Sequence, residues 1–325
     1  MKHPIKNTLI FSALLCLCGA LFMVLGFWAD GSDYMKNTDL GSMDTSYVSL
    51  KNDTSLEKTK IDDYTKIDCK LDYFSLIIKP SSDAHFYLSY NIPNTSNMSD
   101  LEHSVADGTL TLRDSYKDRS GFNIDLGFLN VLFSDMTFTD LADTANVVTL
   151  YVPKDAVLSA STINLSCGDV VLSDLRLASS DINLSYGSLK AQDSTFTDTH
   201  ITVDDGDAEA RGSKFYSSSL TNRYGDVTLT NVLLSGTPCD VDSGDMEAQN
   251  LSIEGQVDIK NNYGDIELQL ARPEGLTIVA NTDYGDIESA LIGATTDEQT
   301  HFEKIADGST NSLYIEVSDG DVTLN

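Results

Sequence analysis

Asn183-Leu-Ser-Tyr-Gly-Ser-Leu189 and Asn262-Tyr-Gly-Asp-Ile-Glu-Leu268 are two copies of one short unit, in which an apolar residue follows a glycine by two positions. The glycine recurs along the second half of the chain at intervals of 19 residues four times, and then of 20, 21 and 35. The recurring residues are Gly168, Gly187, Gly206, Gly225, Gly244, Gly264, Gly285 and Gly320. A fixed period of this length is typical of a repeat architecture, in which each unit stacks on its neighbour.

Apolar residues keep three fixed positions relative to these glycines. The position two residues after the glycine holds Val170, Leu189, Ala208, Val227, Met246, Ile266, Ile287 and Val322. Nine residues after the first five glycines stand Leu177, Phe196, Phe215, Leu234 and Ile253, and five residues before the first four stand Ile163, Ile182, Ile201 and Leu220. The period is too short for a propeller blade, and apolar residues alternate with polar ones as in strands. We therefore predict an all-β fold, a β-helix-like parallel β-solenoid with coils of roughly 19 residues over 158–325.

The segment 61–157 is predicted to be an N-terminal β segment and cap. It contains an unusually apolar insertion, Gly121–Phe138. Because the end of a solenoid exposes its core, we interpret this insertion as a cover for the first coil; the alternative is a hairpin that binds a partner or touches a membrane. Alternating runs typical of strands occupy 66–79, 86–90, 108–112 and 147–152.

The last glycine interval indicates an interruption of the stack. Residues 295–308 are polar and charged, and we expect them to form a loop or a short helix that leaves the stack. The last coil, Leu313–Leu324, is then expected to close the column.

Residues 1–29 have the pattern of a short cytoplasmic tail followed by a transmembrane anchor. No charged residue occurs over 8–28, and these 21 residues would span about 31 Å as a helix, which is the thickness of a bilayer core. Two lysines precede the span and Asp30 follows it, so the sequence predicts a single-pass protein of the cell membrane with the C-terminal part extracytoplasmic. A cleaved signal peptide is the alternative. Residues 30–60 are rich in Ser, Asp, Asn, Thr and Lys, and are predicted to be a flexible stalk.

Composition and charge exclude several classes of function. The chain of 325 residues has 21 Lys plus Arg against 50 Asp plus Glu, a net charge of −29, whereas nucleic-acid binding requires clustered cations. Hydrophobic residues make up 41%, which is enough for a packed core. Cys69, Cys167 and Cys239, the cysteines outside the predicted span, have no spacing that would build a zinc site. We interpret them as isolated apolar fillers.

The phrase Val147-Val-Thr-Leu-Tyr-Val-Pro153, followed by units such as Asn262-Tyr-Gly-Asp-Ile-Glu-Leu268, resembles the bacterial "putative adhesin" family of membrane-anchored β-strand-repeat domains of unknown function. The resemblance covers residues 61–325. It implies a β-repeat domain of the cell envelope and brings no catalytic residues. The sequence departs from the family pattern at Ser188, where the repeat has Asp, and over 118–146.

Aspartates follow most of the recurring glycines and are candidate calcium ligands. Stacked carboxylates one rung apart repel one another by roughly 1 kcal/mol, which a bound cation would relieve. Each coil supplies only one Asp, however, and a turn in which Gly takes a positive φ and Asp caps backbone amides explains the pattern better. The column contains Asp169, Asp207, Asp226, Asp245, Asp265, Asp286 and Asp321.

Tyrosines precede four of the glycines and are candidate ligand-binding aromatics. Exposed rings beside carboxylates could bind sugars by stacking, although tyrosines in β proteins more often pack against their neighbours in the sheet. The four residues are Tyr186, Tyr224, Tyr263 and Tyr284, with Cys167, Asp205, Ser243 and Asp319 at the equivalent positions of other coils.

The sequence favours a non-enzymatic module for cell-envelope interaction, adhesion or stress sensing. No nucleophile-elbow, zinc-protease or P-loop motif occurs, and the five histidines are isolated. The expected partner is a cell-envelope polymer or a membrane protein, and no cofactor is expected. The alternatives are a carbohydrate-active solenoid enzyme and a calcium-dependent adhesin.

Overall fold

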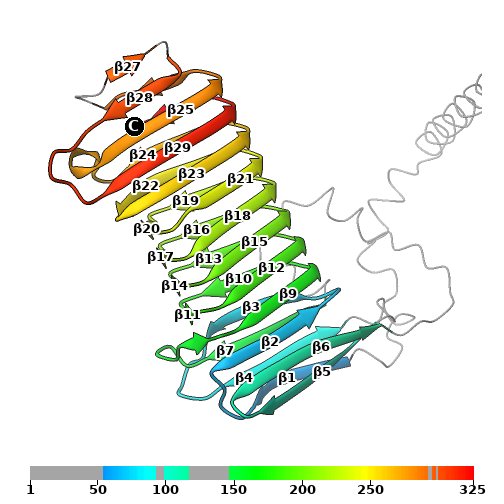
Figure 1. The fold of residues 1–325 in the computed structure, drawn as a ribbon. Coiled ribbons are helices and arrows are strands. Elements are labelled where there is room, and N and C mark those ends of the chain that lie inside the picture. The colour runs from blue at the N-terminus through cyan, green and yellow to red at the C-terminus, as the bar shows by residue number, and fades with distance from the viewer. Residues whose placement is uncertain (1–53, 93–98, 117–145, 292–294, 298) are drawn as a thin grey trace, which may run out of the picture. The chain divides into compact units, whose positions relative to one another are not determined.

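The structure is a computed structural model that describes residues 54–92, 99–116, 146–291, 295–297 and 299–325. Within the compact unit that begins at residue 53, the described residues form a β-solenoid whose strands wind around a continuous hydrophobic core (Figure 1). The predicted span 8–28, the stalk up to residue 53 and the insertion Gly121–Phe138 lie outside the described residues. In the part of the chain that is described, no helix is long and apolar enough to cross a membrane.

Each regular coil contains three strands separated by three corners. In one such coil, β12 (Asp181–Tyr186), β13 (Leu189–Gln192) and β14 (Thr195–Thr197) follow one another along the chain. Each strand pairs in parallel with the strand 19 residues later, so that Leu184 lies opposite Val203. The repeat in the sequence therefore corresponds to one coil of a parallel solenoid.

The strands form three faces, and faces 2 and 3 are continuous through one long strand, β22. Face 1 contains, in spatial order, β5 (Ser99–Ala106), β6 (Thr109–Tyr116), β2 (Lys66–Leu71), β9 (Thr162–Cys167), β12, β15 (His200–Asp205), β18 (Ser219–Tyr224), β21 (Cys239–Ser243), β23 (Gln256–Tyr263), β29 (Ser312–Asp319), β25 (Thr277–Tyr284), β28 (His301–Lys304) and β27 (Thr295–Asp297). Face 2 contains β1 (Thr54–Lys60), β4 (Tyr87–Ile92), β7 (Val147–Val152), β3 (Ser75–Pro80), β10 (Val170–Ser173), β13, β16 (Ala208–Arg211), β19 (Val227–Thr230), β22 (Met246–Glu254), β24 (Ile266–Leu270), β30 (Val322–Leu324) and β26 (Ile287–Ser289). Face 3 contains β8 (Leu158–Ser159), β11 (Arg176–Ala178), β14, β17 (Lys214–Tyr216), β20 (Leu233–Ser235) and the end of β22.

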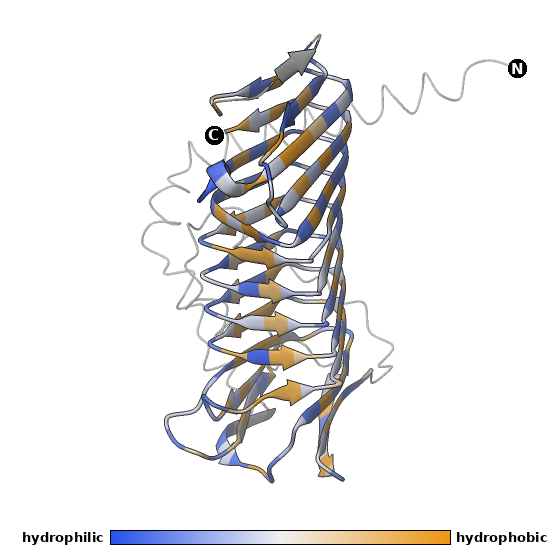
Figure 2. Cartoon of the chain, turned by 60° about the vertical axis from the view of Figure 1, so that its left-hand side comes forward, coloured by the Kyte–Doolittle hydropathy of each residue, from blue (hydrophilic) through white to orange (hydrophobic). Residues whose placement is uncertain are grey.

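The core lies between the faces because alternate residues of each strand point inward, which gives the striped hydropathy of Figure 2. Side-chain size is balanced across the core within a coil. Ala208 and Ala210 on face 2 accompany Phe215 on face 3, and the ring of Phe215 stacks on that of Phe196 with centroids 4.8 Å apart. Small residues on one face thus make room for large ones on another, as close packing requires.

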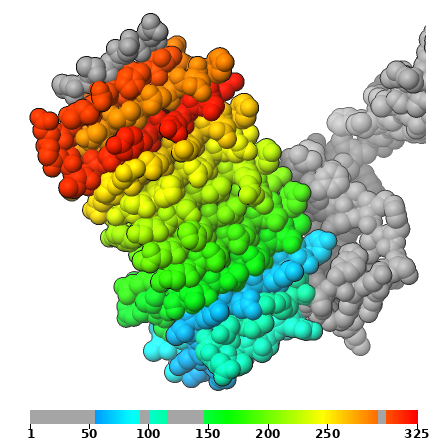
Figure 3. Space-filling model, viewed as in Figure 1, coloured from blue at the N-terminus to red at the C-terminus, as the bar shows by residue number. Residues whose placement is uncertain are grey.

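The C-terminal coil does not close the column, which corrects the sequence prediction. Strand β29 pairs with β23 on one side and with β25 on the other, so the last coil lies between two earlier ones. In Figures 1 and 3 the red coil separates the yellow coil from the orange one. The predicted loop or helix at 295–308 is wrong as well: β27 and β28 form an antiparallel hairpin, and β28 pairs with β25. Because this hairpin occupies the outer edge of β25, the last coil pairs with the inner edge.

The N-terminal end has the same interleaved order. Strand β2 lies between β6 and β9, and β3 lies between β7 and β10. Antiparallel strands β5, β4 and β1 then terminate the two faces. On face 1, an antiparallel hairpin therefore forms each end of the sheet.

The predicted stalk, 30–60, overlaps the folded unit, because β1 (Thr54–Lys60) is an edge strand. Its polar composition is typical of a linker, but β1 pairs antiparallel with β4 and Leu56 packs against the core. The ammonium group of Lys58 lies 4.4 Å from the ring centroids of both Tyr87 and Tyr151. Backbone pairing and these cation–π contacts hold a strand that hydrophobic periodicity does not reveal.

Candidate functional site

The corner between face 1 and face 2 is formed by the recurring glycines. Their φ angles lie between +133° and +157°, as the sequence predicts for a turn that needs positive φ. A Cβ atom on Gly225 would lie 2.3 Å from the carbonyl oxygen of Gly206, and each glycine of the column has an equivalent conflict with the coil beneath it. At these eight positions the neighbouring coil lies so close that only glycine fits.

The aspartate column caps this corner with hydrogen bonds between coils. The backbone N–H of Asp245 donates to Oδ1 of Asp226 at 2.9 Å, and the pattern continues in both directions. Ser188, which replaces the aspartate in one coil, accepts the N–H of Asp207 through its hydroxyl. The carboxylates that accept an N–H from the next coil are Asp169, Asp207, Asp226, Asp245, Asp265 and Asp321. Asp286, in the outermost coil of the column, donates its N–H to Asp321.

These hydrogen bonds give the aspartate column a structural role in the turn. One carboxylate oxygen of most aspartates is engaged by the next coil, which offsets the repulsion between stacked charges. Among the residues that the structure describes, no three His, Cys, Asp or Glu side chains are grouped as a metal site would need. Calcium binding by the column stays an alternative hypothesis.

The tyrosine column lies immediately before the glycines, on the surface at the end of face 1. Its side chains are exposed by 63% at Tyr186, 59% at Tyr224, 61% at Tyr263 and 76% at Tyr284. A fifth member, Tyr73, is 52% exposed and aligns with Cys167, because the pairs Leu71–Leu165 and Leu76–Val170 share one offset. Sequence reasoning missed Tyr73 because Phe74 occupies the glycine position of this coil, so the repeat signature is lost.

The tyrosines do not stack on one another, in contrast to the packing that the sequence favours. Each is separated from the next by a coil with a shorter side chain at the same position: Cys167, Asp205, Ser243 or Asp319. Tyrosines therefore recur every second rung, at about 9.6 Å. Cys167 is exposed in this column, so its interpretation as an apolar filler is wrong.

The other two cysteines that the structure describes are buried thiols. Cys69 and Cys239 are fully buried, as expected of apolar fillers. Burial, together with the nearby Asp240 carboxylate, raises the pKa of Cys239 to about 12, and burial likewise raises the pKa of Cys69. Both thiols are therefore protonated and unreactive at neutral pH.

Polar side chains next to the tyrosine column are paired between coils. Ser166 donates to Asp72 at 2.7 Å, and Asn262 donates to Asp242 at 2.6 Å. On the other side of the corner, a hollow of about 380 Å³ is lined by charged residues that include Lys190, Glu209 and Asp226. The tyrosines thus stand out as an aromatic line between two polar strips.

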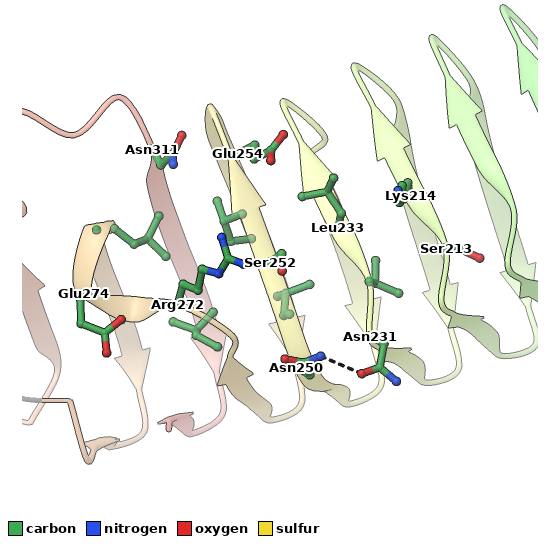
Figure 4. A pocket seen from close by; sticks show the side chains of 16 residues that line it. Ser213, Lys214, Asn231, Leu233, Asn250, Ser252, Glu254, Arg272, Glu274 and Asn311 are labelled. Carbon is green, nitrogen blue, oxygen red and sulfur yellow. Dashed lines mark hydrogen bonds between the residues drawn. The ribbon is translucent and has the colours of Figure 1, made fainter.

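A second hollow, of about 600 Å³, lies where face 3 ends (Figure 4). Its apolar lining includes Leu233 and Ile253, and Arg272 extends toward Ser252. One wall is held by a buried lysine, Lys304, which donates to the carbonyl oxygens of residues 273 and 276. Two cationic and two anionic side chains line the hollow, so its charge is balanced and it selects no obvious ligand: Lys214, Arg272, Glu254 and Glu274.

Residues 64–325 match the family described as Toastrack DUF4097. The chain belongs to the Toastrack family. No curated protein matches the chain. The solved structures that it resembles include one from Bacteroides fragilis, described as a "putative adhesin", with 14% identity over 85% of this chain and 98% of the other and a TM-score of 0.47.

Two further solved structures cover the same share of this Toastrack chain. A "putative adhesin" from Parabacteroides merdae has 9% identity, covers 85% of this chain and 97% of its own, and gives a TM-score of 0.42. A "putative lipid binding protein" from Parabacteroides distasonis has 15% identity, covers 85% of this chain and 98% of its own, and gives a TM-score of 0.41. Their descriptions apply to those proteins and assign no ligand to this one.

Proposed function

We propose that this Toastrack protein is a non-enzymatic interaction module of the cell envelope, which binds an envelope polymer through the tyrosine column. The supporting observation is that five of the eight exposed large hydrophobic side chains in the described residues stand in this one column. Exposed apolar side chains gathered in one place mark interaction sites, and tyrosine is enriched at such sites.

The proposal places the module outside the cell membrane, anchored by residues 8–28. The competing functions are a carbohydrate-active enzyme, which would need a catalytic pair of carboxylates, and a calcium-dependent adhesin, which would need the aspartate column to hold metal.

The test is co-sedimentation of the full chain, in a detergent without a sugar headgroup, with isolated bacterial cell walls. The mixture is spun once in calcium and once in chelator, and the supernatant is checked for released saccharides. Binding in both conditions without release is the expected result. Binding only in calcium would favour the aspartate column as a metal site, release of saccharides would favour an enzyme, and no binding in either condition would overturn the proposal in favour of a protein partner in the membrane.

A further inference from the structure

The tyrosine column has a strict period of two rungs. Along the stack, tyrosine alternates with a shorter residue over nine consecutive coils: Tyr73, Cys167, Tyr186, Asp205, Tyr224, Ser243, Tyr263, Asp319 and Tyr284. The backbone positions of successive tyrosines thus lie about 9.6 Å apart, on strands whose register is fixed by backbone pairing. A surface with fixed repeat distances suits a ligand that is itself periodic.

The alternation is present along the sequence from Cys167 to Tyr263, and the fold continues it at both ends of the stack. Tyr263 and Tyr284 stand in consecutive coils of the chain, which would bring two rings onto adjacent rungs. The inserted strand β29 places Asp319 between them, since Asp319 pairs with both tyrosines. The coil that breaks the sequence order therefore completes the spatial period.

The chemistry of the column suits a sugar chain. The face of a tyrosine ring packs on the apolar C–H face of a sugar ring, and short carboxylate or hydroxyl side chains accept hydrogen bonds from sugar hydroxyls. In an extended β-1,4-linked polysaccharide, successive sugars are flipped, so that the same face recurs at every second unit. The length of two such units is close to the spacing of two rungs, about 9.6 Å.

Charge decides which polysaccharide fits. Asp205 and Asp319 stand inside the column, and the aspartate column runs beside it on a chain with a net charge of −29. A polyanion would meet like charges along its whole length, whereas an uncharged chain offers hydroxyl donors to the same carboxylates.

We propose that the tyrosine column binds an uncharged, extended β-1,4-linked polysaccharide along the axis of the solenoid, with one disaccharide for every two coils. This inference rests on the proposed function and names the class of polymer that the column recognises. Each tyrosine contacts one sugar of a single disaccharide, and affinity grows with the number of tyrosines that the ligand spans.

The probe is a soluble β-1,4-linked hexamer of N-acetylglucosamine, titrated by calorimetry into the full chain in a detergent without a sugar headgroup. A ligand of this length spans about three tyrosines. Replacing two of them, in the variant Tyr186→Ala/Tyr224→Ala, is expected to weaken binding about tenfold or more. The matched control is Tyr314→Ala, which removes a tyrosine that is 39% exposed on face 1 but outside the column, and is expected to leave affinity unchanged.

A second variant tests whether binding depends on the spacing of the tyrosines or only on their number. The exchange Tyr224→Ser/Ser243→Tyr keeps the composition of the column and moves one ring by a single rung. It is expected to weaken binding about as much as the loss of that tyrosine. The displaced ring would lie beside the neighbouring sugar, which is flipped and presents its other face. Equal affinity of the exchanged and wild-type proteins would show that the period is irrelevant and would overturn the proposal.

The outcomes distinguish this inference from the proposed function. Wild-type protein that sediments with cell walls but does not bind the hexamer overturns the inference and leaves the envelope function standing. Hexamer binding without wall binding supports the inference and overturns the envelope function. Tighter binding of polygalacturonate, an anionic polymer, than of the hexamer would overturn the charge argument, and thermal unfolding of each variant checks that the fold is intact.

Discussion

The middle of the solenoid and its two ends are built from similar coils, but the spatial order of the coils follows the sequence only in the middle. In the middle, from β9 to β22, every strand pairs with the strand of the next coil in sequence. At each end, a coil lies between two coils, at least one of which does not adjoin it in the sequence. Strand β2 lies between β6 and β9, and β29 lies between β23 and β25. A repeat can thus grow by local stacking, whereas its ends are fixed by contacts between segments far apart in the chain.

The largest effect is expected from removing the inserted C-terminal coil. Deletion of residues 312–325 takes away five side chains that are at most 4% exposed: Leu313, Ile315, Val317, Val322 and Leu324. At about 2 kcal/mol for each buried side chain, the loss is about 10 kcal/mol, which is comparable to the whole stability of a domain. We expect loss of the cooperative thermal transition, measured by circular dichroism, with rapid amide exchange in β23 and β25.

Deleting one coil from the middle is the matched comparison. Removal of Gly206–Tyr224 excises 19 residues and joins Asp205 to Gly225, which restores the repeat in register. Because middle coils contact only their sequence neighbours, the shortened solenoid is expected to fold with a single cooperative transition at a moderately lower temperature. If both deletions prove equally harmful, the distinction between middle and ends is wrong.

A smaller but still severe effect is expected from Gly225→Ala in the middle. The added Cβ would lie 2.3 Å from the carbonyl oxygen of Gly206, and φ at this position is +138°. Backbone atoms cannot give way as a flexible side chain could, so we expect a loss of about 3 kcal/mol or more in the free energy of unfolding, measured by denaturant titration. The control is Gly275→Ala, where a Cβ meets nothing within 4 Å, and a change within about 0.5 kcal/mol is expected.

The regular part of the fold could be predicted from sequence because its signals repeat at one period. Glycines, inward apolar residues and, except at Ser188, aspartates recur every 19 residues over the first five coils, and each of these columns exists in the structure. The same period also carries buried hydroxyls that the prediction overlooked: Ser161, Ser180, Thr199, Ser218 and Thr237. Several of them accept a backbone N–H from an adjacent coil, as Ser180 does from Ser161 and Ser218 does from Thr199.

The ends could not be predicted because no local pattern states which coil lies beside which. The intervals of 21 and 35 residues indicate an interruption, but not that Leu313–Leu324 would lie between two earlier coils. Nor could polar β1 be told from a linker, since its pairing with β4 uses backbone groups that every sequence possesses. The tyrosines were identified as candidates, and their alternation with shorter residues is present in the sequence from Cys167 to Tyr263. Only the folded stack shows that Tyr73 and Asp319 continue it.

The smallest effect on stability is expected from chemical modification of the cysteines. This modification also reports most directly on the tyrosine column. Cys167 is exposed between Tyr73 and Tyr186, whereas Cys239 is buried in the middle of the stack. At pH 8, iodoacetamide is expected to modify Cys167 readily without changing the thermal transition and to leave Cys239 unmodified, with the sites identified by peptide mass spectrometry.

The pKa of Cys239 sets the pH range in which this contrast holds. Its folded pKa is about 12 against an ordinary value of 9.0, so the protonated thiol is favoured by the folded state. The stability that this proton binding supplies is complete below pH 9.0 and is lost as the pH rises toward about 12, where unfolding exposes the thiolate. Modification of Cys239 at pH 8 in the folded protein would contradict its burial.

If the tyrosine column binds the polysaccharide hexamer, ligand lying across Cys167 should slow the modification of Cys167 by iodoacetamide. An unchanged rate of modification at saturating hexamer would place the ligand elsewhere on the solenoid.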